Sequence, residues 1–334
     1  MAQYGFNFQW MYSFIEGEKP LPADEKALDF MGHYALDFVR IPVDYRFWIK
    51  DWKYLEPLEE NLKYLDAYID TCVKRGMHLC LNLHRAPGYC INRMHIEKHN
   101  LWQDPEAQQG FIYQWAMFAE RYKNISSKYL SFDLLNEPPY IGQHGMTRHI
   151  HEKLMRRVIS AIREVDLNRT IVVDGLDVGM LPIPELAELK VMQSGRGYEP
   201  KAVSHYQAAW CPETKGLGKP VYPNTEYAGK SWTRQTLADH YQPWVDLQQL
   251  GTEVHIGEFG CFNRVENDLA LRWFDDLLSL YQQFGWGYSL WNFKGPFGIV
   301  EHGRPGTQYE KLFGFKVDRQ LLELYLQYRT KKVE

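Results

Sequence analysis

Two glutamates follow short apolar runs of the kind that form β-strands. Glu137 ends the segment LSFDLLNE, which begins at Leu130, and the two prolines after it cannot continue a strand. Glu258 ends the segment VHIGE, which begins at Val254. A pair of carboxylates in one cleft can cleave a glycosidic bond, because one protonates the leaving oxygen while the other supports the oxocarbenium-like centre. An isolated glutamate after a strand is usually a solvated side chain, so this interpretation requires the two to meet at one site.

Other apolar runs also end in side chains that can bind a ligand. Arg40 lies in FVRIPV, His84 in LNLHRAPG and Trp291 in YSLWNF, while Asn136 directly precedes Glu137. A guanidinium, an imidazole, an amide and an indole beside two carboxylates form a set that a purely structural strand end does not need. If the strands are parallel, these side chains meet at the carboxyl edge of the sheet. The sequence therefore predicts one cavity lined by residues that are far apart in the chain.

Apolar runs alternate with amphipathic stretches along the whole chain, which is typical of parallel strands joined by helices. The predicted strands are Tyr4–Phe8, Phe38–Val43, His78–His84, Leu130–Leu135, Thr170–Asp174, Lys190–Gln193, Glu253–Glu258 and Trp286–Trp291. The predicted helices are Leu58–Arg75, Pro105–Tyr122, Thr147–Val165, Thr236–Leu250, Asn267–Phe284 and Asp318–Arg329. Eight strands in 334 residues indicate an α/β protein, a (β/α)8 TIM barrel that forms a single catalytic domain over residues 1–334. The polar segment Gln207–Ser231 is the longest predicted loop.

Composition argues against several classes of function. Lys and Arg number 38 against 42 Asp and Glu, a net charge of -4 without a basic run, so we expect no nucleic-acid partner and no membrane partner. Neither GxGxxG nor GxxxxGK[ST] occurs, and the five cysteines lack CxxC spacing, so no cofactor or metal is expected. Aromatic residues make up 15% of the chain, and we expect some of them to line a cleft for the flat faces of sugar rings.

The motifs, taken together, resemble those of glycoside hydrolase family 5, the cellulase-like branch of the clan A retaining β-glycosidases. The resemblance rests on Arg40 in FVRIPV, His84 in LNLHRAPG, Asn136-Glu137-Pro138, Glu258 in HIGEFG and Trp291 in YSLWNFKGPFG. These motifs span about 250 residues in the family's order, and a GEFG about 120 residues after NEP is far more specific than NEP alone.

The resemblance implies a role for each matched residue. Glu137 would be the general acid/base and Glu258 the nucleophile, with Arg40 beside it to keep it ionised. Asn136 would bind the sugar 2-hydroxyl. His84 would contact the sugar in the glycone subsite, and Trp291 would form the floor of that subsite.

The end of the sixth predicted strand departs from the family pattern, in which a His-x-Tyr motif is usual and the Tyr donates a hydrogen bond to the nucleophile. Aligning GYEPKAVSHYQAAW with that region places Tyr198 on the family's Tyr and Arg196 on its His. His205 then matches a second family His, and Trp210 matches a cleft Trp. The alternative alignment places His205-Tyr206 on the motif directly. Arg196 in place of His indicates a subsite unlike that of ordinary endoglucanases.

The sequence therefore predicts a retaining β-glycoside hydrolase with an oligosaccharide or polysaccharide substrate of gluco or manno type. The loops Tyr89–Trp102 and Gln207–Ser231 could narrow the cleft into a pocket, which would favour short oligosaccharides. The N-terminus carries no recognisable export signal, so we expect a cytoplasmic protein, or a secreted one if a leader has been removed.

Two other classes of function are weighed against this hypothesis. The first is a metal-dependent barrel hydrolase that uses His84, His95 and His99 together with the glutamates; HIEKH places imidazoles at i and i+4 but is not HExxH. The second is a non-catalytic carbohydrate-binding barrel, which only the aromatic content supports. The absence of one catalytic glutamate would favour it, and both are present.

Overall fold

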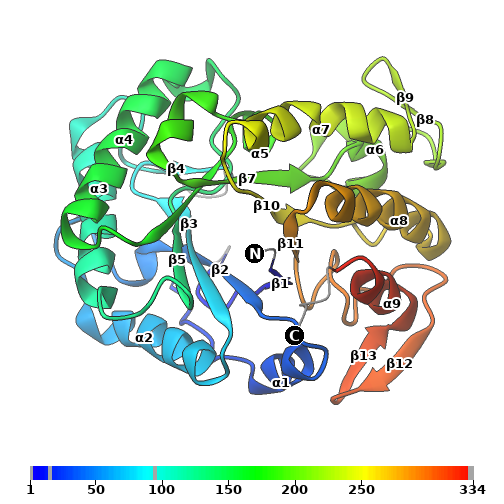
Figure 1. Cartoon of the computed structure of the whole chain (residues 1–334), viewed down its shortest axis with the longest axis horizontal. Coiled ribbons are helices and arrows are strands. Elements are labelled where there is room, and N and C mark those ends of the chain that lie inside the picture. Colours follow the sequence, from blue (N-terminus) through cyan, green and yellow to red (C-terminus); the bar gives the residue numbers. More distant parts are fainter. Residues whose placement is uncertain (1–2, 14–16, 93–95, 330–334) are drawn as a thin grey trace.

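The computed structural model describes residues 3–13, 17–92 and 96–329. Eight parallel strands close into a barrel, because β2 pairs with β3 as well as with β1 (Figure 1). The barrel strands are β1 (Tyr4–Asn7), β2 (Phe38–Asp44), β3 (His78–Ala86), β5 (Leu130–Asp133), β6 (Thr170–Asp174), β7 (Met192–Gly197), β10 (Val254–Phe259) and β11 (Gly287–Leu290). The predicted (β/α)8 TIM barrel is confirmed. That residues 1–334 form one catalytic domain stays a prediction.

Helices surround the barrel (Figure 1). They are α1 (Glu25–His33), α2 (Glu59–Lys74), α3 (Pro105–Tyr122), α4 (Arg148–Val165), α7 (Arg234–Gln249), α8 (Asn267–Phe284) and α9 (Arg319–Gln327). The sequence prediction omitted α1, which spans only nine residues. Asp24, the residue before this helix, caps it, because its side chain accepts the Ala27 N–H. After β6 the chain forms only α5 (Leu176–Gly179) and a 3-10 helix, η3 (Pro184–Leu189), which explains why no long helical pattern precedes the sixth predicted strand.

The sixth barrel strand lies further along the chain than predicted. The prediction placed it at Lys190–Gln193, whereas β7 runs from Met192 to Gly197. The sequence pattern did not indicate the second half of β7, because glycine is rare in strands. Here glycine is required, since a Cβ on Gly197 would lie 2.2 Å from the hydroxyl of Tyr281. The correction places Arg196 on a barrel strand.

Alternate residues of the strands point into the barrel and form two layers. Four residues form a small cluster separate from the main core, here called the lower layer: Phe38, Cys80, Val172 and Met192. Towards the carboxyl ends of the strands the interior is polar, and this upper layer consists of Asn7, Arg40, Asp133, Asp174 and Arg196, all nearly or fully buried. The apolar residues that face outward pack against the helices in the main core.

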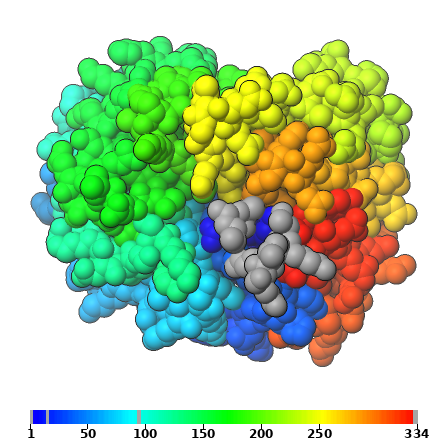
Figure 2. All heavy atoms as spheres, viewed as in Figure 1, coloured from blue at the N-terminus to red at the C-terminus, as the bar shows by residue number. Residues whose placement is uncertain are grey.

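The last helix of the described residues, α9, lies beside the first strand, β1. Figure 2 shows the C-terminal segment in red next to the N-terminal segment in blue. The hydroxyl of Tyr325 in α9 donates to the carbonyl of Gly5 in β1, and Arg329 donates to the carbonyl of Tyr34. The first contact holds α9 against the first strand of the barrel, and the second joins the segment after α9 to the end of α1.

Shorter elements occupy the loops. The predicted loop Gln207–Ser231 contains a hairpin, since β8 pairs with β9 there. The remaining elements are β4 (Tyr89–Cys90), β8 (Thr225–Tyr227), β9 (Lys230–Trp232), β12 (Tyr309–Leu312), β13 (Phe315–Asp318), α6 (Lys201–Ser204), η1 (Tyr45–Phe47), η2 (Gln143–Gly145) and η4 (Pro212–Thr214). Among the residues that the structure describes, no helix has the length and apolar character needed to cross a membrane.

Candidate active site

Glu258 lies at the end of β10, where the strand register shifts after Ile256. A side chain does not fit at the preceding Gly257, because its Cβ would lie 2.4 Å from the hydroxyl oxygen of Ser194. The Glu258 side chain is buried, and each carboxylate oxygen has a donor. Arg40 Nη1 donates to Oε1 at 2.5 Å, and the Tyr198 hydroxyl donates to Oε2 at 3.0 Å. These two charge-assisted bonds fix the orientation of the carboxylate.

Glu137 follows β5 in a left-handed backbone conformation, with φ of 44°. Its N–H donates to Asp174 Oδ2 at 3.0 Å, and its carbonyl accepts the Tyr89 hydroxyl at 2.6 Å. Its carboxylate accepts one bond, from Arg196 Nε at 3.2 Å. Burial and the neighbouring Glu258 carboxylate raise the pKa of Glu137 to about 7, although Arg196 opposes this shift. The two glutamates therefore lie in different environments.

Arg40 holds the site together from β2. Its guanidinium donates to Asn7 Oδ1 at 2.9 Å and to Asp133 Oδ2 at 2.8 Å, in addition to Glu258. It also donates to Asn136 Oδ1 at 3.0 Å. Because these partners belong to β1, β5 and β10 or follow them directly, one side chain links strands on several sides of the barrel.

His84 ends the inward-facing residues of β3, where burial and the cations of Arg40 and Arg196 hold its pKa well below its usual value. A neutral imidazole results. Its Nε2 lies 3.4 Å from Asn136 Nδ2, and its ring stacks on Trp291 with the ring centres 5.3 Å apart. Trp291 is only partly buried, at the end of β11.

Arg196 is the residue for which the sequence suggested no definite role. It lies on β7, and its Nη2 donates to Asn136 Oδ1 at 2.8 Å. The same guanidinium lies between the two glutamates, 3.2 Å from Glu137 and 3.6 Å from Glu258. It also binds both carboxylate oxygens of Asp174.

Two buried aspartates of the site were not predicted from the sequence. Asp174 ends β6 and accepts bonds from Arg196 and from the Glu137 N–H. Asp133 ends β5 and accepts a bond from Arg40, while burial and Asp174 raise the pKa of Asp133 to about 7. A signal was present in both cases, since each is a charged residue inside or at the end of an apolar run. The arginine partners are distant in the chain, however: Arg196 is 22 positions from Asp174, and Arg40 is 93 positions from Asp133.

Most of the chain matches one known protein family. A family model described as cellulase (glycosyl hydrolase family 5) matches residues 1–295. The chain belongs to glycoside hydrolase family 5. Membership of family 5 makes it a retaining β-glycoside hydrolase whose substrates are oligosaccharides or polysaccharides.

Individual relatives agree with this assignment. The family 5 chain is 25% identical to endoglucanase C of Acetivibrio thermocellus, over 81% of this chain and 83% of the relative. It is 28% identical to a β-xylosidase of Phanerodontia chrysosporium, over 85% of this chain and 59% of the relative. A crystal structure of a glycoside hydrolase is 59% identical, covers 99% of this chain and 100% of its own, and has a TM-score of 0.97. The endoglucanase Cel5A of Thermotoga maritima, 21% identical over 97% and 96% of the two chains with a TM-score of 0.77, shares the fold.

The alignment question at β7 is decided by contacts with Glu258. The hydroxyl that donates to Glu258 belongs to Tyr198, whereas the hydroxyl of Tyr206 accepts a bond from Gln207 at 3.2 Å. His205 packs edge-on against Tyr198, and burial lowers the pKa of His205 to about 3, so its imidazole is neutral. The site of this family 5 enzyme is therefore aromatic on the Tyr198 side.

Trp210 extends this aromatic side towards solvent. It is 58% exposed, and its ring lies against Phe262 and Phe297, with centres 4.9 and 6.1 Å away. An exposed indole supported by other aromatic rings can stack on a flat apolar face without losing its own packing. The contacts place Trp210 near Tyr198, while its role, like those of the other predicted site residues, stays a prediction.

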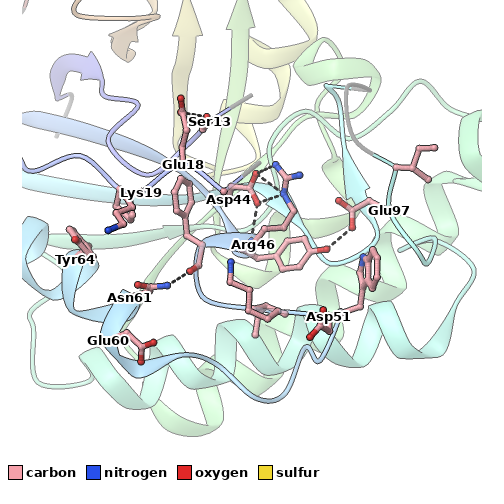
Figure 3. A pocket seen from close by; sticks show the side chains of 18 residues that line it. Ser13, Glu18, Lys19, Asp44, Arg46, Asp51, Glu60, Asn61, Tyr64 and Glu97 are labelled. Atoms are coloured by element: carbon pink, nitrogen blue, oxygen red, sulfur yellow. Dashed lines mark hydrogen bonds and ion pairs between the residues drawn. The ribbon is translucent and has the colours of Figure 1, made fainter. Parts of the chain in front are cut away.

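A cavity of about 600 Å³ lies between the loops that follow β1 and β2 (Figure 3). Asp44 and Glu97 lie on its wall, and both bind Arg85, at 3.2 and 2.6 Å. Arg85 follows His84 in the chain. Neither Glu137 nor Glu258 lines this cavity.

The residues proposed for a metal site do not come together in the described part of the chain. His99 accepts or donates a bond to the Tyr54 hydroxyl, while Glu97 binds Arg85 and Tyr45. His95 lies outside the described residues. Among residues 3–13, 17–92 and 96–329, no group of three or more His, Cys, Asp or Glu side chains is arranged to hold a metal ion.

Proposed function

We propose that this family 5 enzyme cleaves β-linked gluco- or manno-oligosaccharides by double displacement, with Glu258 as nucleophile and Glu137 as general acid/base. The observation that carries the proposal is the contrast between the two carboxylates. Glu258 accepts bonds on both oxygens, from Arg40 and Tyr198, which fix the orientation that a nucleophile needs. Glu137 has one donor, and its pKa is raised to about 7, as a general acid requires.

The proposed reaction has two steps. In the first, a Glu258 oxygen forms a bond to the anomeric carbon, the bond from that carbon to the leaving oxygen breaks, and the Glu137 proton passes to the leaving oxygen. In the second, Glu137 takes a proton from water, the water oxygen bonds to the anomeric carbon, and the bond to Glu258 breaks. Two displacements retain the configuration of the anomeric carbon.

The remaining site residues would bind the sugar. Asn136 has its Oδ1 occupied by two arginines, which directs its amide nitrogen towards the site as a donor for the sugar 2-hydroxyl. His84 would contact a sugar hydroxyl in the glycone subsite, where the partly buried indole of Trp291 would form the floor. The exposed ring of Trp210 would stack on a sugar further along the cleft.

Substrate type is proposed from the relatives. Endoglucanase C and cellodextrinase A of Ruminococcus flavefaciens, 22% identical over 78% of this chain, are named for β-glucan substrates. Structures of Thermotoga maritima Cel5A contain cellobiose in one case and mannotriose in another. Both sugar types are therefore candidates. A cytoplasmic location, which would favour short oligosaccharides, stays a prediction.

The test is hydrolysis of a panel of aryl β-glycosides (glucoside, mannoside, xyloside and cellobioside) by the wild type and by Glu258→Gln. We expect turnover of at least one substrate, with loss of about 10⁴-fold or more in the variant. Glu253→Gln is the matched control, because Glu253 is exposed just before the opposite end of β10. Wild-type rates in Glu258→Gln, or an inverted product anomer by NMR, would overturn the mechanism. Activity confined to xylosides would overturn the proposed substrate.

A further inference from the structure

The upper layer and the two glutamates next to it together carry more carboxylates than cations. Arg40 and Arg196 face Asp133, Asp174, Glu137 and Glu258 through ion pairs of 3.8 Å or less. The cluster is therefore electrically neutral only when two of the four carboxyl groups carry a proton. Since unpaired charge is costly in a buried site, the contacts that each arginine makes decide which carboxyl groups those are.

Arg196 is directed mainly towards Asp174. Its two terminal nitrogens bind the two carboxylate oxygens of Asp174, in the fork geometry that makes guanidinium–carboxylate pairs strong. Only its Nε, the less accessible donor, reaches Glu137, at 3.2 Å. A guanidinium stays charged at every relevant pH, and Asp174 is the carboxylate that pairs with both terminal nitrogens of this one.

Asp174 also positions the backbone of Glu137. Its Oδ2 accepts the Glu137 N–H at 3.0 Å, and Glu137 has the positive φ of 44° that non-glycine residues seldom adopt. Such a conformation persists where surrounding contacts over-determine it. One carboxylate therefore fixes both the backbone of Glu137 and the guanidinium that contacts its side chain.

We propose that Arg196 and Asp174 are a pair of positioning residues that together hold Glu137 in place, and that Asp174, by offsetting the charge of Arg196, keeps Glu137 protonated before glycosidic cleavage. This inference rests on the proposed function, because it assumes that Glu137 is the general acid. Arg196 orients the carboxyl group, and Asp174 takes up most of the arginine's charge, so that Glu137 is not forced to ionise. The charged and titratable groups around Glu137 are Arg196, Asp174, Glu258 and Tyr198, with Arg40 across Asn136.

The decisive measurement is the pH profile of kcat/KM, whose alkaline limb reports ionisation of the general acid in the free enzyme. Asp174→Asn removes a negative charge near Glu137 and releases Arg196 towards it, so the alkaline limb should move down by about one pH unit. Arg196→Gln removes the cation, so the limb should move up by about the same amount. Opposite shifts cannot result from a general loss of stability.

Two further variants separate charge from placement. Arg196→Lys keeps the charge but cannot bridge Glu137, Asn136 and Asp174, so it should lower kcat about tenfold or more with the alkaline limb nearly unchanged. Arg169→Lys is the matched control, because Arg169 is a buried arginine before β6, bound to backbone carbonyls far from the site. It should leave the pH profile as in the wild type.

The outcomes distinguish this inference from the proposed function. Glu137→Gln should abolish the alkaline limb; if the limb persists there, Glu137 is not the general acid and the proposed function fails. If that variant loses the limb but Asp174→Asn shifts it upward or not at all, the positioning role alone is overturned. Should Arg196→Gln fail to fold, Asp174→Asn decides the question by itself, because its side chain has the same size and shape.

Discussion

The two layers inside the barrel are built on the same strands but differ in chemistry. On β2, Phe38 packs in the lower layer and Arg40, two residues later, carries a charge in the upper layer. On β6, Val172 and Asp174 show the same change over two residues. The lower layer gains stability from apolar burial. The buried charges of the upper layer reduce that stability, and they are close together because catalysis needs them there.

Buried arginines show the difference most directly. Arg169, before β6, donates to the backbone carbonyls of Tyr122, Ile125 and Leu130 at 2.8 to 2.9 Å. Burial lowers the pKa of Arg169, because one aspartate, Asp166, compensates its charge only in part. For Arg196, several carboxylates raise the pKa instead. An arginine that donates to the backbone of several segments has a structural role. An arginine that faces several carboxylates influences their protonation.

After Glu258→Gln, the largest expected effect is that of Glu137→Gln, next to the upper layer. Loss of general acid assistance should lower kcat/KM about 10³-fold for an aryl glycoside with a poor leaving group. The loss should be much smaller for a dinitrophenyl glycoside, whose leaving group needs no proton. Steady-state rates on both substrates check this. Equal losses on the two would show that the residue acts through structure rather than through proton transfer.

Arg40→Lys should have the next largest effect. An ammonium group cannot bridge Asn7, Asp133 and Glu258 together, so the nucleophile loses its fixed orientation. We expect kcat to fall about 10²-fold. Arg169→Lys should lower the melting temperature but leave kcat within about twofold. A kcat loss of similar size in both variants would remove the distinction between the two kinds of buried arginine.

A lower-layer substitution should affect stability and not catalysis. Val172→Ala removes two methyl groups from a closely packed cluster, so the free energy of unfolding should fall by about 2 kcal/mol. Denaturant titration measures this change, and kcat should remain near the wild-type value. A large fall in kcat, with the variant fully folded, would mean that the lower layer helps to position Asp174.

The smallest effect concerns the pH dependence of stability. Burial lowers the pKa of His78, which packs against Phe38 at the edge of the lower layer, to about 4. In the unfolded chain a histidine has a pKa of about 6.5, so acidification below that value protonates the unfolded state first and destabilises the native one. Between pH 7 and 5.5 the wild type should lose about 1 kcal/mol relative to His78→Gln.

Asp133 in the upper layer contributes to the pH dependence of stability with the opposite sign. Because the pKa of Asp133 is raised to about 7, its native carboxyl group binds a proton while the unfolded one is still ionised, so acidification stabilises the native state through this group. That contribution is the same in wild type and in His78→Gln, so it cancels in the difference. An equal pH dependence in the two proteins would show that His78 is not held neutral.

Local patterns allowed much of the fold and part of the site to be predicted. Strand–helix alternation predicted the barrel, and the strand-end segments identified Glu137, Glu258 and Arg40, which the structure brings together. The boundaries of β7 and the helix α1 were missed, because two glycines weaken the first and a short amphipathic pattern weakens the second. Asp133 and Asp174 were also missed, because their arginine partners lie on distant strands.

The sequence by itself determined the order of strands and helices and which polar side chains stand at the strand ends. These properties depend on neighbouring residues, since periodicity and turn-forming residues act over a few positions. Only the tertiary structure decided that Tyr198 contacts Glu258, that Arg196 turns to Asp174, and that burial and Glu258 raise the pKa of Glu137. Desolvation and Coulomb interaction depend on distance in space, and those distances exist only once the barrel has closed.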